Sequence, residues 1–521
     1  MRLVVDKEII MKKLILLLPT ALLVVSMSAL QADTILVPSQ QPTIQAGIDA
    51  AVDSDTVLVA DGTYTGDSNR NINFHGKAIV VMSENGPYQT TINCQGLGRG
   101  FHFHRGEVQS SVVQGFLIKN GIAPGIWGGG VFCDHSSPSI INCIFWNNYA
   151  VFGGGIACEQ WASPIIERCV FVENTGRDYG GGIIMNNGCN PTITGCYFLR
   201  NNAITGAAMR CGGLTSPTIS SCFIIGNIAS QNGGGIELRL NSSPSISDCV
   251  ILDNHSGNQG GGVKIGGTCD PIVTRCLISD NTAGGEGGGV MVRNHAGPVF
   301  ENCTISNNVT YSGQGGGIAI EGVAHPTVEN SILWDNEPGE IDVVSNDITV
   351  TYSDVKDGWP GEGNINEAPT FVLPGKRDYR LIWESPCIDT GNPDSLDADG
   401  TRRDMGAYYF NQNDYLTLYM TPDATEVTQG GNIGVTYTII NRWQQKEPFS
   451  ALTRVTLPDG EVRTVLGPEE YHVCGGYTAK FHLTYDIPSC AYVGMYEYQG
   501  AIGVPPSTLY DDDSFKFTVI E

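Results

Sequence analysis

The stretch from Gly153 to Asn174 reads GGGIACEQWASPIIERCVFVEN, and variants of it follow one another along the middle of the chain. Most variants contain a glycine triplet, a proline, a cysteine five residues after the proline and an asparagine five residues after the cysteine. The asparagine returns every 26 to 28 residues, at Asn120, Asn148, Asn174, Asn201, Asn227, Asn254, Asn281, Asn308 and Asn336. A fixed period of this length is typical of proteins that stack one repeated unit.

Apolar and variable residues alternate within each unit. The first and third residues after the triplet are apolar, as in Ile156 and Cys158. Another apolar residue follows the proline, as in Ile166, and a further pair begins at the cysteine, as in Cys169 and Phe171. Alternation with a period of two marks a β-strand with one buried face. Three short strands and three turns per unit predict one coil of a parallel β-helix, an all-β solenoid with coils about 4.8 Å apart.

The asparagine and cysteine columns have structural interpretations. The asparagines fall in predicted turns, where Asn tolerates a left-handed backbone and stacked amides can hydrogen-bond from coil to coil. The cysteines are predicted to point inward, where Cys behaves as a small hydrophobe, although 16 cysteines would suggest disulfides if the chain is exported. Cys474 and Cys490, outside the repeats, are the better disulfide candidates. We predict a structural ladder formed by Asn148, Asn174, Asn201, Asn227, Asn254, Asn281, Asn308 and Asn336.

The motifs Gly154-Gly155-Ile156 and Phe171-Val172-Glu173-Asn174 resemble the repeats of chlamydial polymorphic outer-membrane proteins. More broadly, the repeats from Gly115 to Asn336 resemble the right-handed parallel β-helix, or pectate-lyase-like, superfamily. The resemblance implies the fold. It does not imply one activity, because this superfamily hosts lyases, hydrolases, epimerases, adhesins and proteins with no known chemistry.

The beginning of the chain predicts export. Basic residues at Lys12 and Lys13, the apolar run Leu14–Val25 and small residues up to Ala32 are typical of a secretory signal peptide. We assign it to residues 1–32, with Met11 as the true start. The apolar run is too short to favour a membrane span, and we expect no membrane-spanning segment in the mature chain.

Two folded parts are expected after the signal peptide. The amphipathic stretch Thr43–Val52 predicts a short helix, which resembles the helical cap of pectate-lyase-like proteins. We expect the capped β-helix over residues 33–410. From about residue 411, Thr- and Tyr-rich alternating runs separated by turns predict a β-sandwich of roughly immunoglobulin-like size, over residues 411–521.

The charge of the chain limits its partners. The formal net charge is −25, from 29 basic and 54 acidic side chains. Nucleic-acid binding needs a basic footprint, so the composition argues against it. It also disfavours the capture of acidic polymers, unless Ca²⁺ or a local basic patch opposes the overall charge. We expect an extracellular or cell-surface location and an extracellular polysaccharide or cell-surface glycan as the partner; the sequence leaves the oligomeric state open.

A charged wall is the candidate ligand-binding surface. Stacking places outward residues of four neighbouring coils within roughly 15 Å of one another. One interpretation, which the sequence favours, is a cross-strand ion-pair ladder. The others are a recognition surface and a lyase site, where a base removes the proton beside a carboxylate and a cation stabilises the enolate. Pectate lyases, which the chain resembles, bind Ca²⁺ with a carboxylate cluster and use an arginine as the base. The wall consists of Arg210, Glu237, Arg239, Lys264 and Arg293.

Other acidic residues offer two further hypotheses. A glycoside hydrolase needs two carboxylates about 5 to 10 Å apart, and Asp253 and Asp280 stand at corresponding turns of neighbouring coils, with Asp335 at another. Solvated turns are the favoured interpretation. The stretch from Ser395 to Gly400 half-matches a calcium loop through Asp397 and Asp399. These two residues are the metal candidates, for Ca²⁺, against the favoured interpretation of an acidic turn.

The regularity of the repeats favours a role without catalysis, since no long insertion is available to shape a catalytic groove. The sequence therefore predicts a secreted or cell-surface β-helix repeat protein that binds carbohydrate or acts as an adhesin. The alternative is a polysaccharide lyase or glycoside hydrolase of the pectate-lyase-like superfamily that acts on an extracellular polysaccharide. The sequence leaves open whether the protein is an enzyme.

Overall fold

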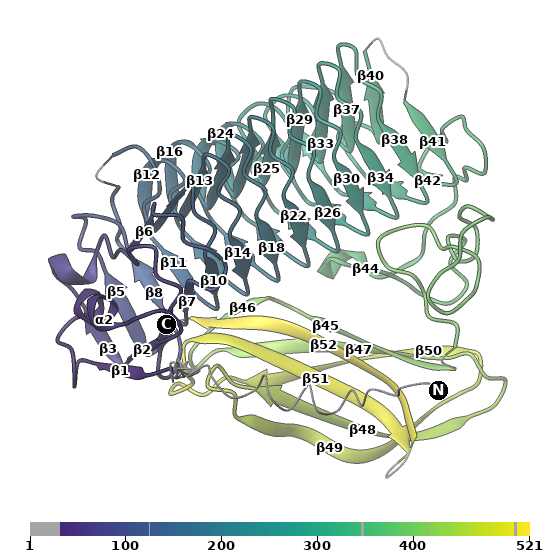
Figure 1. Cartoon of the computed structure of the whole chain (residues 1–521). Helices are drawn as coiled ribbons and strands as arrows, with labels where there is room; N and C mark the ends of the chain where they lie inside the picture. Colours follow the sequence, from purple (N-terminus) through teal and green to yellow (C-terminus); the bar gives the residue numbers. More distant parts are fainter. Residues whose placement is uncertain (1–31, 124, 345–347, 414, 505–507, 521) are drawn as a thin grey trace, which may run out of the picture.

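The computed structural model describes residues 32–123, 125–344, 348–413, 415–504 and 508–520. The predicted signal peptide lies outside the described residues, apart from its last position. A long parallel solenoid occupies most of the described chain, and a smaller, mainly antiparallel part lies beside it (Figure 1). Among the described residues, no helix is long and apolar enough to cross a membrane.

The predicted N-terminal helix is present as α2 (Ile44–Ala50). The hydroxyl of Thr43 accepts a hydrogen bond from the Ala46 N–H and so satisfies one of the free donors of the first turn. The helix buries Ile44 and Ile48 and contacts the first two strands of the solenoid, β1 (Thr34–Val37) and β2 (Thr56–Val59). It therefore lies at the start of the stack, as the sequence places it.

Each regular coil adds one strand to four parallel sheets, which we call sheets 1 to 4 in the order that the chain visits them. One coil consists of β14 (Ile165–Glu167), β15 (Val170–Val172), β16 (Thr175–Tyr179) and β17 (Ile183–Asn186). The sheets contain 13, 12, 7 and 10 strands. The prediction of three strands per coil was wrong, because the residues between the asparagine turn and the glycine triplet are extended and pair as sheet 3.

The interior of the solenoid follows the predicted columns. The rings of Phe145, Phe171 and Phe198 stack with centroids 4.9 and 4.7 Å apart, close to the coil spacing. The cysteine column is buried, and its thiols donate to backbone carbonyls, as Cys169 Sγ does to Ile140 O at 3.4 Å. The inward orientation of both columns is confirmed.

All 16 cysteines are free, so the predicted disulfide between Cys474 and Cys490 was wrong. Both side chains are exposed. They lie beyond opposite ends of the ten-residue strand β50 (Tyr477–Asp486), which separates them by roughly 30 Å. A disulfide requires Cα atoms within about 7 Å.

The asparagine ladder is present. Asn174 Oδ1 accepts hydrogen bonds from the N–H and the side-chain amide of Asn148, both at 3.0 Å, and the Asn174 amide donates to Asn201 Oδ1 at 3.1 Å. The amide also donates to Phe145 O at 2.8 Å, so the polar atoms of the buried side chain are satisfied. The pattern continues to Asn336.

The prediction that the column asparagines themselves adopt the left-handed backbone conformation was wrong. In the ladder coils the left-handed residue precedes the column asparagine, as Glu173 (φ 55°), Arg200 (φ 52°) and Asp253 (φ 55°) do. These residue types are varied, so the turn itself does not demand asparagine. The side-chain ladder is what requires asparagine at this position.

After β41 (Thr349–Thr351) and β42 (Asp354–Val355) the chain leaves the parallel ladders. It forms a hairpin of β43 (Phe371–Leu373) and β44 (Asp378–Leu381) and then two further sheets, which we call the sandwich. One sheet has the order β45 (Leu416–Pro422), β47 (Asn432–Asn441) and β50; the other has the order β46 (Glu426–Thr428), β52 (Thr508–Ile520), β51 (Gly494–Val504), β48 (Glu447–Thr456) and β49 (Val462–Val473).

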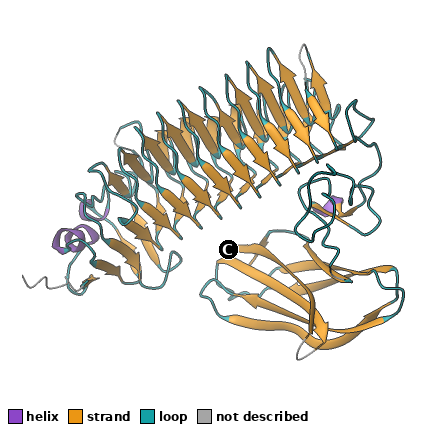
Figure 2. Ribbon diagram, turned by 45° about the vertical axis from the view of Figure 1, so that its right-hand side comes forward, coloured by secondary structure: helices purple, strands orange, loops and turns teal. Residues whose placement is uncertain are grey.

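The sandwich folds back along the solenoid (Figures 1 and 2). Its two sheets enclose a common core that includes Val435, Tyr498 and Val519. Four alternating runs of the sequence fall within β47, β48, β50 and β52, apart from Leu457; these runs are Val435–Ile440, Ala451–Leu457, Thr478–Tyr485 and Ser514–Ile520. That this part lies against the side of the stack is not encoded in the repeat.

Candidate functional site

The outer face of sheet 2 is apolar. In each coil the residue between the inward cysteine and the next inward position points out of the solenoid. Sheet 2 is therefore apolar on both faces, a pattern typical of strands that are covered on both sides. We call these residues the apolar strip: Ile144, Val170, Tyr197, Phe223, Val250 and Leu277.

The hairpin and the sandwich cover this strip unequally. Near the hairpin, Leu277 is 4% exposed, and the Ser279 hydroxyl lies 2.9 Å from the Tyr379 hydroxyl. Farther toward the N-terminus, Tyr197 and Phe223 are only half-buried beneath the sandwich. The packing is therefore close at one end of the strip and leaves space at the other.

That space consists of three neighbouring cavities, which we together call the interdomain slot. Its largest cavity has a volume of about 670 Å³, and neighbouring cavities of about 250 and 400 Å³ share lining residues with it. The slot runs beside the strip from Ile144 in β11 (Ile144–Trp146) to Leu277 in β31 (Leu277–Ser279). Five coil steps separate these strands in sheet 2, so the slot is roughly 24 Å long.

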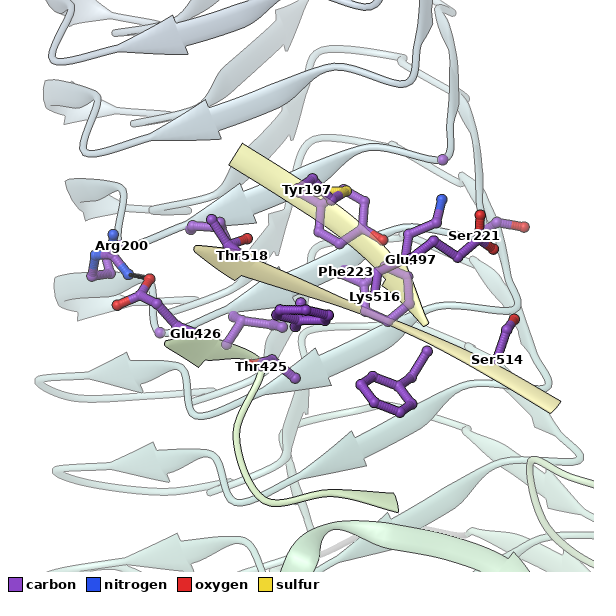
Figure 3. Close-up of a pocket in the computed structure, with 17 residues that line it drawn as sticks. Tyr197, Arg200, Ser221, Phe223, Thr425, Glu426, Glu497, Ser514, Lys516 and Thr518 are labelled. Atoms are coloured by element: carbon purple, nitrogen blue, oxygen red, sulfur yellow. Dashed lines mark hydrogen bonds and ion pairs between the residues drawn. The ribbon is translucent and has the colours of Figure 1, made fainter. Parts of the chain in front are cut away.

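The two walls of the slot differ in chemistry (Figure 3). The solenoid wall consists mainly of Tyr197, Leu199, Phe223 and Ile225, from β19 (Tyr197–Leu199) and β23 (Phe223–Ile225). The rings of Tyr197 and Phe223 stack at 4.8 Å. The sandwich wall carries the polar side chains of Thr425, Glu426, Glu497, Ser514, Lys516 and Thr518, and Met495, Phe515 and Phe517 also line it.

Strand alternation explains the polar wall. Phe515 and Phe517 pack with the sandwich core, so Ser514, Lys516 and Thr518 emerge on the opposite face of β52. Glu497 and Lys516 are cross-strand partners. Within the described part of the chain, neither side chain has a hydrogen-bond or ion-pair partner, and both line the slot. Burial and the Glu497 charge raise the pKa of the Tyr197 phenol, which keeps it protonated.

Polar contacts hold the sandwich beside the slot. Arg200 pairs with Glu426 of β46 at 2.8 Å and reaches Glu173 at 3.5 Å. At the other end, the Tyr88 hydroxyl accepts a hydrogen bond from the Met495 N–H at 2.9 Å. The Arg200 pair is half-exposed, and such pairs contribute at most about 1 kcal/mol.

The wall predicted from the sequence lies elsewhere, on sheet 4. Arg210, Glu237 and Lys264 stand in register on β21 (Met209–Gly212), β25 (Ile236–Leu238) and β29 (Val263–Gly266). They are only 7%, 0% and 8% exposed. Arg210 Nε donates to Glu237 Oε2 at 3.1 Å, and its guanidinium lies over the Tyr179 ring at 4.1 Å. Tyr179, the last residue of the sheet 3 strand β16, thus helps to cover the wall.

The remaining wall residues complete a ladder of charges. Arg239 Nη1 lies 4.0 Å from Glu237 Oε1. Arg293 pairs with Glu321 at 3.2 Å and donates to Gln259 at 3.0 Å. Burial, together with the Arg293 and Arg239 charges, lowers the pKa of Lys264 to about 8 against the opposing effect of Glu237. The structure thus joins Arg210, Glu237 and Arg239 by ion pairs, while Arg293 pairs with Glu321 and Lys264 has no ion pair among the described residues.

The other carboxylates are engaged at turns. Arg377 binds Asp253 at 2.6 Å and approaches Asp280 at 3.7 Å, so one cation is shared by the two carboxylates considered for hydrolysis. Lys356 binds Asp335 at 2.6 Å.

The two metal candidates likewise serve a turn. Asp397 pairs with Arg403 at 3.1 Å and accepts from the Asp404 N–H, while Asp399 accepts from the N–H groups of Thr401 and Gln412. Across the described ranges, no group of three or more metal-ligating side chains is assembled. The arrangement is that of an acidic turn held by hydrogen bonds.

Comparisons with known proteins identify the solenoid only. Residues 129–257 and 218–361 match the family model of the right handed beta helix region. No curated protein matches the chain. One solved structure similar to part of the chain is the alkylpurine DNA glycosylase AlkC of Pseudomonas fluorescens bound to DNA with an abasic site analog, at 9% identity and a TM-score of 0.18. Another is the sporulation control protein Spo0M of Bacillus subtilis, at 13% identity and a TM-score of 0.16. The matches cover 21% and 20% of this chain and 31% and 50% of those chains.

Proposed function

Because the repeat region belongs to the right-handed beta helix family, a family that specifies a fold and not a reaction, we propose that this is an exported carbohydrate-binding protein that does not cleave its ligand. The interdomain slot is the proposed binding site. The protein would act outside the cell or at its surface, as the predicted signal peptide suggests.

The unlike walls of the slot support this function. Sugars present C–H groups to aromatic and aliphatic side chains and hydroxyl groups to charged and polar ones. The slot offers Tyr197 and Phe223 for the first kind of contact, and Glu497 and Lys516 for the second. Ligand sites combine an apolar lining with a few polar groups in this way. The length of roughly 24 Å suits a polymer better than a single sugar.

The paired state of the wall on sheet 4 favours binding over catalysis. Glu237 is fully buried and hydrogen-bonded to Arg210, so it cannot approach a substrate without disrupting the ladder. Asp253 and Asp280 share Arg377. Arg377 holds both side chains at the turn, although burial raises the pKa of Asp253 against the effect of this cation.

A glycan array followed by titration calorimetry tests the proposal. We expect Tyr197→Ala to weaken binding of the glycan found on the array at least about tenfold, since buried aromatic contacts dominate such sites. Tyr311→Ala is the matched control, because Tyr311 is 70% exposed and lies outside the slot. Binding that is unchanged in Tyr197→Ala, or absent for every glycan, would overturn the proposal.

A second candidate function, a polysaccharide lyase, rests on one observation. Lys264 has a pKa lowered to about 8 and lies near the guanidinium groups of Arg239 and Arg293, as a base beside an enolate-stabilising cation would. Ultraviolet absorbance of unsaturated products, followed with uronate polysaccharides and Ca²⁺, tests it. Product formation that is lost in Lys264→Ala would establish the lyase.

A further inference from the structure

The interdomain slot has features that select among carbohydrates. The inference below rests on the proposed function and names the class of glycan that the slot accepts. Two properties carry it: the charge balance of the lining and the difference between the walls.

Charges in the largest cavity cancel. Arg200 and Lys516 are the basic residues of the lining, and Glu426 and Glu497 are the acidic ones, so two positive and two negative charges give a formal total of zero. Arg200 and Glu426 pair with each other at one edge. Over all three cavities the lining has six basic and five acidic residues, and this excess of one positive charge is too small to offset the repulsion of an acidic polymer by a chain that carries −25.

The walls impose a second requirement. A sugar in the largest cavity has the aromatic strip on one side and the polar face of β51 and β52 on the other (Figure 3). A ring that is apolar on both faces would turn one of them toward Glu497 and Lys516 and remove their hydration without replacing it, which is costly for charged groups. A ring with one apolar face and one hydroxyl-bearing face satisfies both walls.

We infer that the slot binds an uncharged pyranose polymer whose rings have unlike faces, and that it excludes acidic polysaccharides. Galactose meets this description, because its axial hydroxyl makes one face polar and leaves the other apolar. The equatorial hydroxyls of a β-1,4-linked glucan lie at the ring edges, so its two faces are alike. The Tyr197 and Phe223 rings contact the apolar face, while Glu497 and Lys516 bind hydroxyl groups.

Calorimetry with the full protein and three defined oligosaccharides tests the inference. The probes are β-1,3-galactan, in which the axial 4-hydroxyl of each ring stays free, cello-oligosaccharide and oligogalacturonate fragments of equal length. We expect the galactan fragment to bind at least about tenfold more tightly than the cello-oligosaccharide, because the cello-oligosaccharide would leave Glu497 and Lys516 without hydroxyl partners. Its Kd should change less than about twofold between about 50 mM and about 500 mM NaCl, since no net charge is neutralised.

A charge-changing variant sharpens the test. Glu497→Lys converts the balanced lining to a formal +2, so we expect it to gain salt-sensitive binding of oligogalacturonate and to lose galactan affinity. Lys446→Glu, at an exposed site outside the slot, is the charge control. It should change neither affinity.

The outcomes separate the inference from the function on which it rests. Oligogalacturonate binding by the unaltered protein, abolished by Tyr197→Ala, would overturn the neutral-glycan inference and leave carbohydrate binding in the slot intact. Equal or tighter binding of the cello-oligosaccharide would overturn the argument from unlike faces. Absence of binding to all three fragments and to the array would overturn the proposed function itself.

Discussion

Glu340 ends the asparagine ladder at Asn336. Its carboxyl group accepts a hydrogen bond from the Asn336 N–H at 3.2 Å and another from the Asn336 side-chain amide. Burial raises the pKa of Glu340 to about 7, although both hydrogen bonds oppose the rise. The N–H and the side-chain amide of Asn336, the last donors of the asparagine ladder, thus bind a carboxyl group that can titrate.

Stability should therefore depend on the protonation of Glu340. A carboxyl group whose folded pKa lies above its ordinary value of 4.5 keeps its proton in the folded state after the unfolded chain has lost it. The free energy of unfolding then falls as the pH rises from 4.5 to about 7, by up to about 3 kcal/mol. Denaturant unfolding across this range should show the fall, and Glu340→Gln should reduce it. An equal pH slope in both proteins would contradict the assignment.

Removal of one central amide should be costly. In Asn227→Ala, the buried N–H and side-chain amide of Asn201 lose the Oδ1 atom that accepts from them at 2.9 and 3.0 Å. Each buried group left without a partner costs about 1 to 3 kcal/mol, so we expect a loss of about 2 to 5 kcal/mol in urea unfolding. Asn258→Ala, at an exposed amide, should change stability by less than about 0.5 kcal/mol. Equal losses in the two variants would argue against the ladder.

Thiol reactivity should distinguish two classes of cysteine. Cys474 and Cys490 are exposed, and the other 14 cysteines are buried. Burial raises the pKa of thiols such as that of Cys276, which further suppresses the reactive thiolate. A colorimetric thiol titration should detect two groups in the native protein and 16 in denaturant without reductant. A lower denatured count would reveal disulfides.

Arg380 should be required for the position of the sandwich. It binds Asp378 of the hairpin at 2.8 Å and Asp513 of β52 at 2.6 Å, and it lies over the Tyr419 ring. Arg380→Ala leaves two partly buried carboxylates without this cation, a change that costs about 3 to 5 kcal/mol when a buried pair is broken. We expect faster hydrogen exchange in β45 and β52.

Arg463→Ala is the matched control for that exchange experiment. Arg463 pairs with Glu461 at 2.8 Å, but both side chains are more than half exposed. Such pairs contribute about 0 to 1 kcal/mol, so exchange in β45 and β52 should stay as in the unaltered protein. Similar exchange in the two arginine variants would mean that Arg380 does not hold the sandwich.

The repeat made much of the solenoid predictable. The inward positions of Cys169 and Phe171 follow from alternation, and the ladder role of Asn174 follows from its period. Sheet 3 was missed because its strands lack a regular apolar alternation. That omission also hid the burial of the wall, since Tyr179 of sheet 3 lies against Arg210.

The apolar strip could have been found in the sequence. Tyr197 and Phe223 stand beside inward columns, so both faces of their strands are apolar, which predicts a covered sheet. What covers the sheet is a different question. The sandwich residues that face the strip, such as Glu497 and Lys516, lie about 300 positions later in the chain, and nothing local marks them as its partners.

The sequence by itself determined three of the four strands of each coil, because hydrophobic alternation and a strict period act between residues that are neighbours along the chain or one coil apart. It likewise determined the asparagine column, which satisfies buried polar groups, and the cysteine and phenylalanine columns, which fill the interior. Only the tertiary structure decided that the sandwich turns back onto sheet 2, that Arg377 neutralises Asp253, and that a slot remains between unlike walls. These relations depend on how two separately packed surfaces meet, and a periodic pattern carries no information about that meeting.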